Sequence, residues 1–316
     1  MSLDVVTFGE PLFLFYANET GELKDVDSWS RALAGAETNV ATGYARLGFD
    51  VGLVTKLGED SMGAFIIDSL HKEGINTEGV EFTDERFTGM YFKGKVLQGD
   101  PPIEYYRKGS AASTMSVDDY DADYYAQAKL IHATSIFAAL SDSTREYSKH
   151  VLKTAKENGQ TISFDPNLRL NLWDRDVMIK TVNEMANYAD FFLPGKGEGE
   201  ILTGYEDAED IAKFYLDKGV KIVAVTTAEG AYLATQDDEF KFIPGYKAEV
   251  VDTVGAGDGF AVGFGSAYLD GLSPEEAVDR ANAIGARAVT FPGDSDGLPT
   301  REELAEFKKN TPRVEK

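Results

Sequence analysis

Short apolar segments alternate with longer amphipathic segments along most of the chain. Apolar runs of strand length lie at 3–8, 51–58, 130–134, 161–165, 190–194 and 221–227, and segments with helical periodicity lie at 38–48, 61–74, 143–159, 176–189 and 207–219. Parallel strands need long crossover connections, which are usually helices. The alternation therefore predicts an α/β fold in which helices cover both faces of a mostly parallel sheet.

The alternation is interrupted between residues 80 and 107. TGMYFKGKVL (88–97) and IEYYRKG (103–109) are rich in Tyr and Phe, alternate as strands do, and are joined by the turn sequence QGDPP. FLFYA (13–17) is similarly strand-like. These segments predict a small antiparallel sheet inserted into the α/β core.

We expect one domain over residues 1–316, with the inserted β lid formed by approximately 11–34 and 80–110. A flap of this kind beside a sheet edge is a candidate cover for a binding site. Because exposed apolar sheet tends to be covered, the aromatic lid also predicts a homo-oligomer, most simply a dimer formed through the lid.

The composition excludes several classes of function. A formal net charge of -23 opposes binding to nucleic acid or to an anionic membrane, since such binding depends on clustered Lys and Arg. The chain has no cysteine, which excludes a disulfide framework, a thiolate zinc site and a cysteine nucleophile. The first residues lack a basic segment, and Glu10 and Pro11 break their apolar run, so we expect no signal peptide and a cytoplasmic protein.

The segment VVDTVGAGDGFAVGF (250–264) places glycines directly before an apolar helical run. A helix that begins near Gly257 would present the unpaired N–H groups of Gly255, Ala256 and Gly257 at its positive end, where a transferring phosphoryl group can bind. Asp258, in the first turn, would face a substrate hydroxyl and accept its proton. The loop therefore predicts an anion hole and a general base side by side.

The same glycines allow two other interpretations. In the dinucleotide-binding pattern G-x-G-x-x-G the third glycine position would be Phe260, and the segment lies near the end of the chain, so this pattern is disfavoured. Glycines that only permit a tight turn before a packed helix are the second alternative. No Walker-type sequence, G-x-x-x-x-G-K-[ST], occurs in the chain.

Two segments resemble the signatures of the ribokinase-like (PfkB) family of sugar kinases. DTVGAGDGFAVGF (252–264) is similar to the C-terminal signature, whose aspartate is the catalytic base, and AGAETNVATGYARLGFDVGLVTKLG (34–58) is similar to the N-terminal one. The resemblance covers essentially the whole chain. It implies a three-layer α/β/α core, Asp258 as general base, Gly255–Gly257 as anion hole, and a reaction that uses ATP and Mg²⁺.

YYRKGSAAS (105–113) and FDPNLR (164–169) resemble the branch of that family that phosphorylates the terminal C6 hydroxyl of 2-keto-3-deoxygluconate to give 2-keto-3-deoxy-6-phosphogluconate. A planar guanidinium suits this sugar acid, because it can bind a carboxylate through two parallel hydrogen bonds. The substrate-binding residues that the resemblance implies are Gly35, Asn39, Tyr91, Tyr105, Arg107, Arg169 and Asp294. A salt bridge on the lid is an equal alternative for Arg107, and simple packing within the lid is an alternative for the two tyrosines.

On the nucleotide side, the resemblance implies contacts from Asp165, Asn167, Thr227, Gly230, Gly255, Gly257 and Asn282. It also places Glu198 near Mg²⁺, acting through water, since Mg²⁺ favours oxygen ligands and retains several waters. The chain departs from the family pattern at Gly195, where an Asn is common, and at Thr226–Ala228, where a lysine and a glycine are common. Both departures leave the glycine loop and Asp258 intact.

Two other functions stay open. A fructokinase, or another neutral-sugar kinase of the same family, would share the glycine loop and would not require Arg107 and Arg169. A catalytically silent sugar-acid sensor on this fold is disfavoured, because the loop retains Asp258. We therefore expect a carbohydrate kinase whose ligands are a small sugar acid and ATP.

Overall fold

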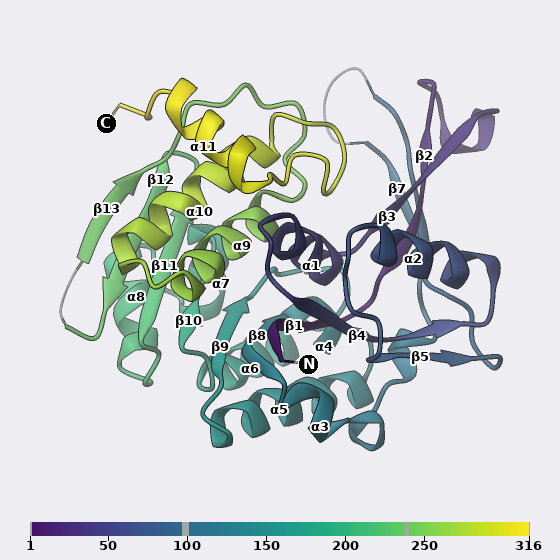
Figure 1. The fold of residues 1–316 in the computed structure, drawn as a ribbon, viewed down its shortest axis with the longest axis horizontal. Helices are drawn as coiled ribbons and strands as arrows, with labels where there is room; N and C mark the ends of the chain where they lie inside the picture. Colours follow the sequence, from purple (N-terminus) through teal and green to yellow (C-terminus); the bar gives the residue numbers. More distant parts are fainter. Residues whose placement is uncertain (1, 97–100, 238–239, 316) are drawn as a thin grey trace.

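The computed structural model describes residues 2–96, 101–237 and 240–315. Its larger sheet forms the centre of the molecule (Figure 1). The strands of this sheet lie in the order β13 (Phe240–Pro244), β12 (Gly230–Thr235), β11 (Ile222–Thr227), β10 (Phe191–Phe192), β9 (Thr161–Asp165), β8 (Ala128–Thr134), β1 (Leu3–Phe8), β4 (Val51–Gly58) and β5 (Val80–Thr83). Neighbours from β5 to β11 are parallel, and β12 and β13 add an antiparallel edge.

Helices cover both faces of this sheet (Figure 1). One face carries α1 (Ala36–Arg46), α2 (Ser61–Lys72), α9 (Ala256–Leu269), α10 (Pro274–Ala288) and α11 (Arg301–Asn310). The other face carries α3 (Ala122–Tyr125), α4 (Ser135–Ala138), α5 (Asp142–Glu157), α6 (Arg175–Ala186), α7 (Lys196–Thr203) and α8 (Ala208–Leu216). Each face has its own cluster of buried apolar side chains, so the predicted three-layer α/β/α core is confirmed.

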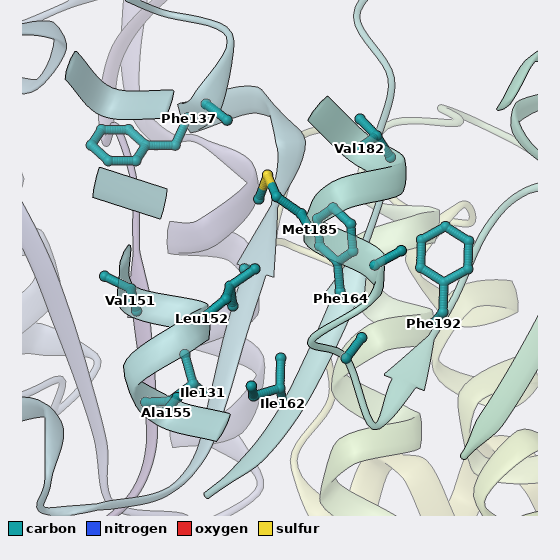
Figure 2. Packing of buried hydrophobic residues seen from close by; sticks show 14 of the residues in the cluster. Ile131, Phe137, Val151, Leu152, Ala155, Ile162, Phe164, Val182, Met185 and Phe192 are labelled. Carbon is teal, nitrogen blue, oxygen red and sulfur yellow. The ribbon is translucent and has the colours of Figure 1, made fainter. Parts of the chain in front are cut away.

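The apolar cluster beneath α5 and α6 explains the near-continuous apolar strands. Ile131 on β8 and Ile162 on β9 lie under these helices with Leu152 and Met185 (Figure 2). The residue before Ile131, Leu130, belongs to the cluster on the opposite face. Successive side chains of a strand point to opposite faces, so both must be apolar when helices cover both faces. Burying each such side chain fully contributes about 1.5–3 kcal/mol.

A second, smaller sheet, here called the lid, stands beside the main one. Its strands lie in the order β3 (Trp29–Ala34), β2 (Leu12–Ala17), β6 (Met90–Lys93) and β7 (Ile103–Tyr106). The outer pairs β2–β3 and β6–β7 are antiparallel, as expected, whereas the central pair β2–β6 is parallel. Most of the predicted QGDPP turn lies outside the described residues. Short 3₁₀ helices occur at η1 (Leu23–Asp25), η2 (Ala112–Thr114) and η3 (Val117–Asp119).

One segment that the sequence places in the lid belongs to the main sheet. Residues of β5 pair in parallel with β4, with Val80 opposite Thr55. The physical reason is that β4, α2 and β5 form one β-α-β unit, so that the chain returns alongside β4 before it enters the lid. The antiparallel β12–β13 edge is a further feature that the strand–helix alternation does not predict, because no helix separates these two strands.

Gly263 allows α9 and α10 to pack closely, since a Cβ on it would lie 2.7 Å from the backbone nitrogen of Ala281. We expect Gly263→Ala to lower the free energy of unfolding by about 1–3 kcal/mol, because the added methyl overpacks this helix contact. Gly197→Ala in α7 is the control, since its Cβ would meet nothing within 4 Å, and it should stay within about 1 kcal/mol of the wild type. Urea denaturation followed by circular dichroism measures both, and equal stability of the two variants would contradict the prediction.

Candidate active site

The carboxyl edge of the main sheet and the lid enclose a cavity of about 470 Å³. Open parallel sheets bind their ligands at this edge. Asn39 and Asp258, which are 219 positions apart, meet here through a hydrogen bond. The predicted residues that line the cavity are Gly35, Asn39, Tyr91, Tyr105, Arg107, Asp165, Asn167, Arg169, Glu198, Gly255, Gly257, Asp258 and Asp294.

Asp258 lies in the first turn of α9 and is buried. Its Oδ2 accepts a hydrogen bond from Asn39 Nδ2 at 2.7 Å, and its Oδ1 accepts one from Asn167 Nδ2 at 3.3 Å. Burial raises the pKa of this carboxyl to about 7. The charges of Glu37 and Asp294 act in the same direction, against the hydrogen bond from Asn39 and the positive charge of Arg169. A carboxylate whose pKa is near neutral is well matched to accept a proton.

The helix α9 begins one residue earlier than predicted, at Ala256, with Gly255 as its N-cap. Gly255 has a φ of +82°, and a Cβ on it would collide with the carbonyl oxygen of Asp294. Only glycine fits this position without displacing that loop. The N–H groups of Gly255, Ala256 and Gly257 donate to no acceptor within the described chain, so the positive end of the helix is available to an anion.

Glu198 and Asp165 bring two carboxylates to the same part of the cavity. Oε1 of Glu198 accepts from the N–H of Leu168 at 2.6 Å, and Oε2 accepts from the N–H of Gly195 at 2.8 Å. Burial, together with the negative charges of Glu198 and Asp258, raises the pKa of Asp165 well above its ordinary value. A divalent cation would relieve this repulsion, and carboxylate oxygens are the ligands that Mg²⁺ prefers.

Asn167 lies in the turn that follows β9 and has a φ of +40°, a region that residues other than glycine rarely adopt. Its N–H donates to Asp165 Oδ1 at 3.0 Å, while its side-chain amide donates to Asp258. The turn therefore holds one residue between two buried carboxylates. Strained backbone conformations of this kind are typical of functional sites, where the position of a side chain is maintained at a cost in local stability.

On the lid side, Tyr91 is buried and its Oη donates to Asp294 Oδ2 at 2.9 Å. The ring of Tyr105 lies 5.1 Å from that of Tyr91, centroid to centroid. Burial raises the pKa of Asp294, and its second oxygen, Oδ1, is buried without a hydrogen-bond partner in the described chain. An unpaired buried acceptor is costly, and a substrate hydroxyl would satisfy it.

The two predicted arginines differ in their surroundings. Arg107 Nε donates to Glu10 Oε2 at 2.6 Å, and the side chain of Glu10 is only 1% exposed. The alternative interpretation of Arg107 as a salt-bridge residue thus describes a real ion pair, which is buried at the cavity rather than on the lid surface. Arg169 lines the same cavity and donates to the carbonyl of Leu168 at 3.3 Å, but it forms no ion pair within the described residues.

A second cavity of about 470 Å³ meets the first at Gly257. It lies between the turn after β11 and the helices α9 and α10, and the predicted residues Thr227, Gly230, Ala256, Gly257 and Asn282 line it. Thr227 Oγ1 donates to the carbonyl of Gly230 at 3.1 Å, and Asn282 Nδ2 donates to the carbonyl of Ile243 at 3.0 Å. Of the predicted nucleotide-side residues, Thr227, Gly230 and Asn282 therefore lie in the second cavity, whereas Asp165, Asn167 and Gly255 lie in the first, and Gly257 lines both.

The sequence does not predict Glu10, Glu37 and Lys93 as part of the first cavity, yet all three line it. Glu37 is buried, accepts from Thr134 Oγ1 at 2.5 Å, and has a pKa raised mainly by burial. The available signal was an acidic residue two positions after the first strand, Glu10, and another among the small residues at the start of a helix, Glu37. Neither position indicates by itself which side chain it will pair with.

In the part of the chain that the structure describes, no three or more His, Asp or Glu side chains form a group that could hold a metal ion by themselves. Nor is any helix there both long and apolar enough to cross a membrane.

Known proteins resemble this chain along nearly its whole length. A family model described as pfkB family carbohydrate kinase matches residues 2–301. The chain is 51% identical over 311 residues to the 2-dehydro-3-deoxygluconokinase of Bacillus subtilis (strain 168), which covers 97% of this chain and 96% of that protein.

Solved structures show the same relationship in three dimensions. The PfkB protein from Polaromonas sp. JS666 matches with a TM-score of 0.90 and 45% identity, over 96% of this chain and 99% of that one. A putative Ribokinase II from E. coli in complex with ATP and Mg²⁺ matches with a TM-score of 0.89 and 27% identity, over 97% and 99% of the two chains. Two signature segments, a shared fold and a half-identical relative therefore agree that this chain belongs to the pfkB family of carbohydrate kinases.

Proposed function

We propose that this carbohydrate kinase phosphorylates the terminal C6 hydroxyl of 2-keto-3-deoxygluconate, also called 2-dehydro-3-deoxygluconate, with ATP as the donor and Mg²⁺ as its metal. The observation that carries the choice of a sugar acid is Arg169, a cavity guanidinium with no carboxylate partner within the described residues. Its charge acts on the nearby carboxylates of Asp165 and Asp258 without forming a close ion pair, so its N–H groups stay available to a substrate carboxylate, which a neutral sugar would not provide. The name of the Bacillus subtilis relative supports the same substrate.

Asp258 acts as the general base. Its two oxygens are oriented by Asn39 and Asn167, so the carboxylate keeps one geometry as the C6 hydroxyl approaches. The hydroxyl oxygen attacks the γ-phosphorus as its proton passes to Asp258, and the bond to the leaving oxygen of the nucleotide breaks. Burial keeps this proton acceptor out of bulk water, which is why its pKa lies near neutral.

The amides of Gly255, Ala256 and Gly257 receive the transferring phosphoryl group. They lie where the sugar cavity and the nucleotide cavity meet, at the positive end of α9. ATP would occupy the second cavity, beside Thr227, Gly230 and Asn282. Asp165 and Glu198 would hold Mg²⁺, Glu198 through water, and that ion neutralises charge on the triphosphate when bound. Asn167, in the segment after β9, would lie near the phosphates of the nucleotide.

The remaining cavity residues bind and orient the sugar acid. Arg169 supplies the charge that pairs with the substrate carboxylate, while Arg107, already paired with Glu10, offers its remaining N–H groups as oriented donors. Asp294 Oδ1 accepts from a sugar hydroxyl. The positive φ of Gly35, +120°, lets the backbone approach the sugar, and Tyr91 and Tyr105 close the lid over it.

We place the enzyme in the cytoplasm, where ATP and Mg²⁺ are supplied.

The lid also supports a dimer. Its outer face carries Phe15 stacked on Phe92 at 4.9 Å, with Trp29 and Tyr106 edge-on to Phe92 at 5.2 Å and 5.7 Å. Tyr106 is 49% exposed. Because clustered aromatic side chains on an exposed sheet face favour burial, we propose that a second copy of the chain covers this face.

A panel of sugar substrates, which includes 2-keto-3-deoxygluconate, fructose and ribose, tests the proposed function. We expect kcat/KM with ATP and Mg²⁺ to be highest for 2-keto-3-deoxygluconate. Arg169→Met should lower kcat/KM for the sugar acid by roughly 10- to 100-fold, because it removes a charged hydrogen-bonding partner, and should change fructose turnover little. A higher kcat/KM for fructose or ribose than for the acid would replace the proposal with a neutral-sugar kinase.

The pH profile tests the general base. Because the base must be ionised, wild-type kcat/KM should fall as the pH drops through about 7 and should be level above it. Asp258→Asn should lose on the order of a hundredfold or more in kcat and should lack this step. Turnover of Asp258→Asn close to that of the wild type, with the fold intact by circular dichroism, would rule out the assignment.

The oligomeric state tests the lid interface. We expect the wild type to sediment as a dimer or a larger assembly of dimers, and Tyr106→Glu to shift it toward the monomer, because a charge would be buried in the aromatic contact. Tyr205→Glu is the control, since Tyr205 is 47% exposed but lies outside the lid. A monomeric wild type in analytical ultracentrifugation would contradict the proposed interface.

A further inference from the structure

Two alternate residues of lid strand β6 reach across to the core. Tyr91 and Lys93 lie on one face of the strand, because side chains two apart point the same way. Tyr91 Oη donates to Asp294, and Lys93 Nζ donates to Asp252 Oδ2 at 2.8 Å. The proposed function accounts for the tyrosine through the substrate. It gives no role to Lys93, whose side chain is only 12% exposed.

Asp252 lies between the lid and two loops near the start of α9, the glycine loop and the loop that carries Asp294. Its Oδ2 binds Lys93, and its Oδ1 accepts from the N–H of Val254 at 3.1 Å, within the segment that leads into the glycine loop. The backbone N–H of Gly293, in the loop that also carries Asp294, lies near the same carboxylate and helps to lower its pKa. One carboxylate therefore joins a lid strand to the segment before the glycine loop, next to the loop that carries Asp294.

The two loops touch at the residue that opens the anion hole. Gly255 packs against the carbonyl oxygen of Asp294 so closely that no side chain fits between them. A shift of Asp252 or of Asp294 would therefore move the first N–H groups of α9. Each of these carboxylates accepts a hydrogen bond from a side chain of β6. A movement of the lid strand would therefore change the shape of the anion hole.

The Lys93–Asp252 ion pair is sheltered enough to matter. The two side chains are 12% and 22% exposed, so solvent screens the pair less than it screens a surface pair. Burial opposes ionisation of Asp252, but the hydrogen bond and the charge of Lys93 together with backbone N–H groups outweigh it, and the pKa of Asp252 lies below its ordinary value. Removing the ammonium would leave a partly buried carboxylate without its counter-charge.

We infer that Lys93 is a positioning residue that couples sugar binding beneath the lid to formation of the anion hole that receives the phosphoryl group. This inference rests on the proposed function of the cavity, but not on the identity of the sugar. Contacts with the sugar fix the position of β6, and Lys93 on that strand then fixes the position of Asp252. Asp252 in turn keeps the glycine loop in the conformation that binds ATP. Binding of either ligand then favours binding of the other, since coupling is reciprocal.

The test measures that coupling directly. The Kd of a non-hydrolysable ATP analogue with Mg²⁺ is determined by calorimetry, with and without a saturating concentration of the best sugar from the substrate panel. In the wild type we expect the sugar to tighten analogue binding about tenfold, within the usual range of coupling. The coupling ratio is the Kd of the analogue without sugar divided by its Kd with sugar. In Lys93→Met this ratio should fall to within about twofold of one, while the Kd of the analogue alone changes little.

Four further variants distinguish a positioning role from general weakening of the protein. Lys93→Arg keeps the charge and should retain most of the coupling ratio. Lys95→Met is the matched control, because Lys95 lies on the same chain segment but donates to the carbonyl of Asn18 within the lid, and it should behave as the wild type. Asp252→Asn should lose coupling as Lys93→Met does, and the double variant should lose no more than either single one.

Some outcomes would overturn the inference. A wild-type ratio near one, or an unchanged ratio in Lys93→Met, would show that the ion pair carries no coupling. Weaker sugar binding in Lys93→Met with the ratio intact would make Lys93 a substrate contact instead. Loss of coupling in Lys95→Met as well would indicate general weakening of the lid. If the panel selects another sugar, the substrate proposal fails while this test still applies with that sugar.

Discussion

The amino end of α9 packs directly on the backbone of the loop that carries Asp294, and the active site is arranged around this contact. Gly255 has a left-handed conformation and no side chain, so the helix can begin against that carbonyl oxygen. The first N–H groups of α9 then face the junction of the two cavities. With the helix held there, Asp258 in its first turn can lie only beside them.

Charge in the site is balanced by local pairing rather than by the net charge of the chain, which is strongly negative. Buried carboxylates gather around the cavity, and burial raises the pKa values of Asp165, Asp258 and Asp294. Glu10 is matched by Arg107, and Asp252 by Lys93. Such an acidic cavity is favourable only when cations arrive with the ligands or are built into the wall. Arg169 forms no close ion pair within the described residues, and its charge acts to lower the pKa values of Asp165 and Asp258.

Much of the site was accessible from the sequence because its residues sit in signatures whose local geometry is self-contained. A glycine loop before an apolar helix favours an anion site at the helix amino end, so roles for Gly255 and Asp258 could be proposed without coordinates. Arg107 was different. Whether its guanidinium faces a ligand or a carboxylate depends on Glu10, which is 97 positions away. The placement of β5 in the main sheet likewise depended on which strand edge was available to it.

The sequence by itself determined the α/β layering and the place of the glycine loop before an apolar helix, since apolar periodicity and backbone conformation are local properties of the chain. Only the tertiary structure decided which charges meet. Ion pairs such as Arg107 with Glu10 and Lys93 with Asp252 join residues 97 and 159 positions apart. No sequence periodicity connects such positions, because their distance is set by how the lid docks on the sheet. The physical reason is that electrostatic pairing depends on separation in space and on burial, both of which arise only after the layers have packed.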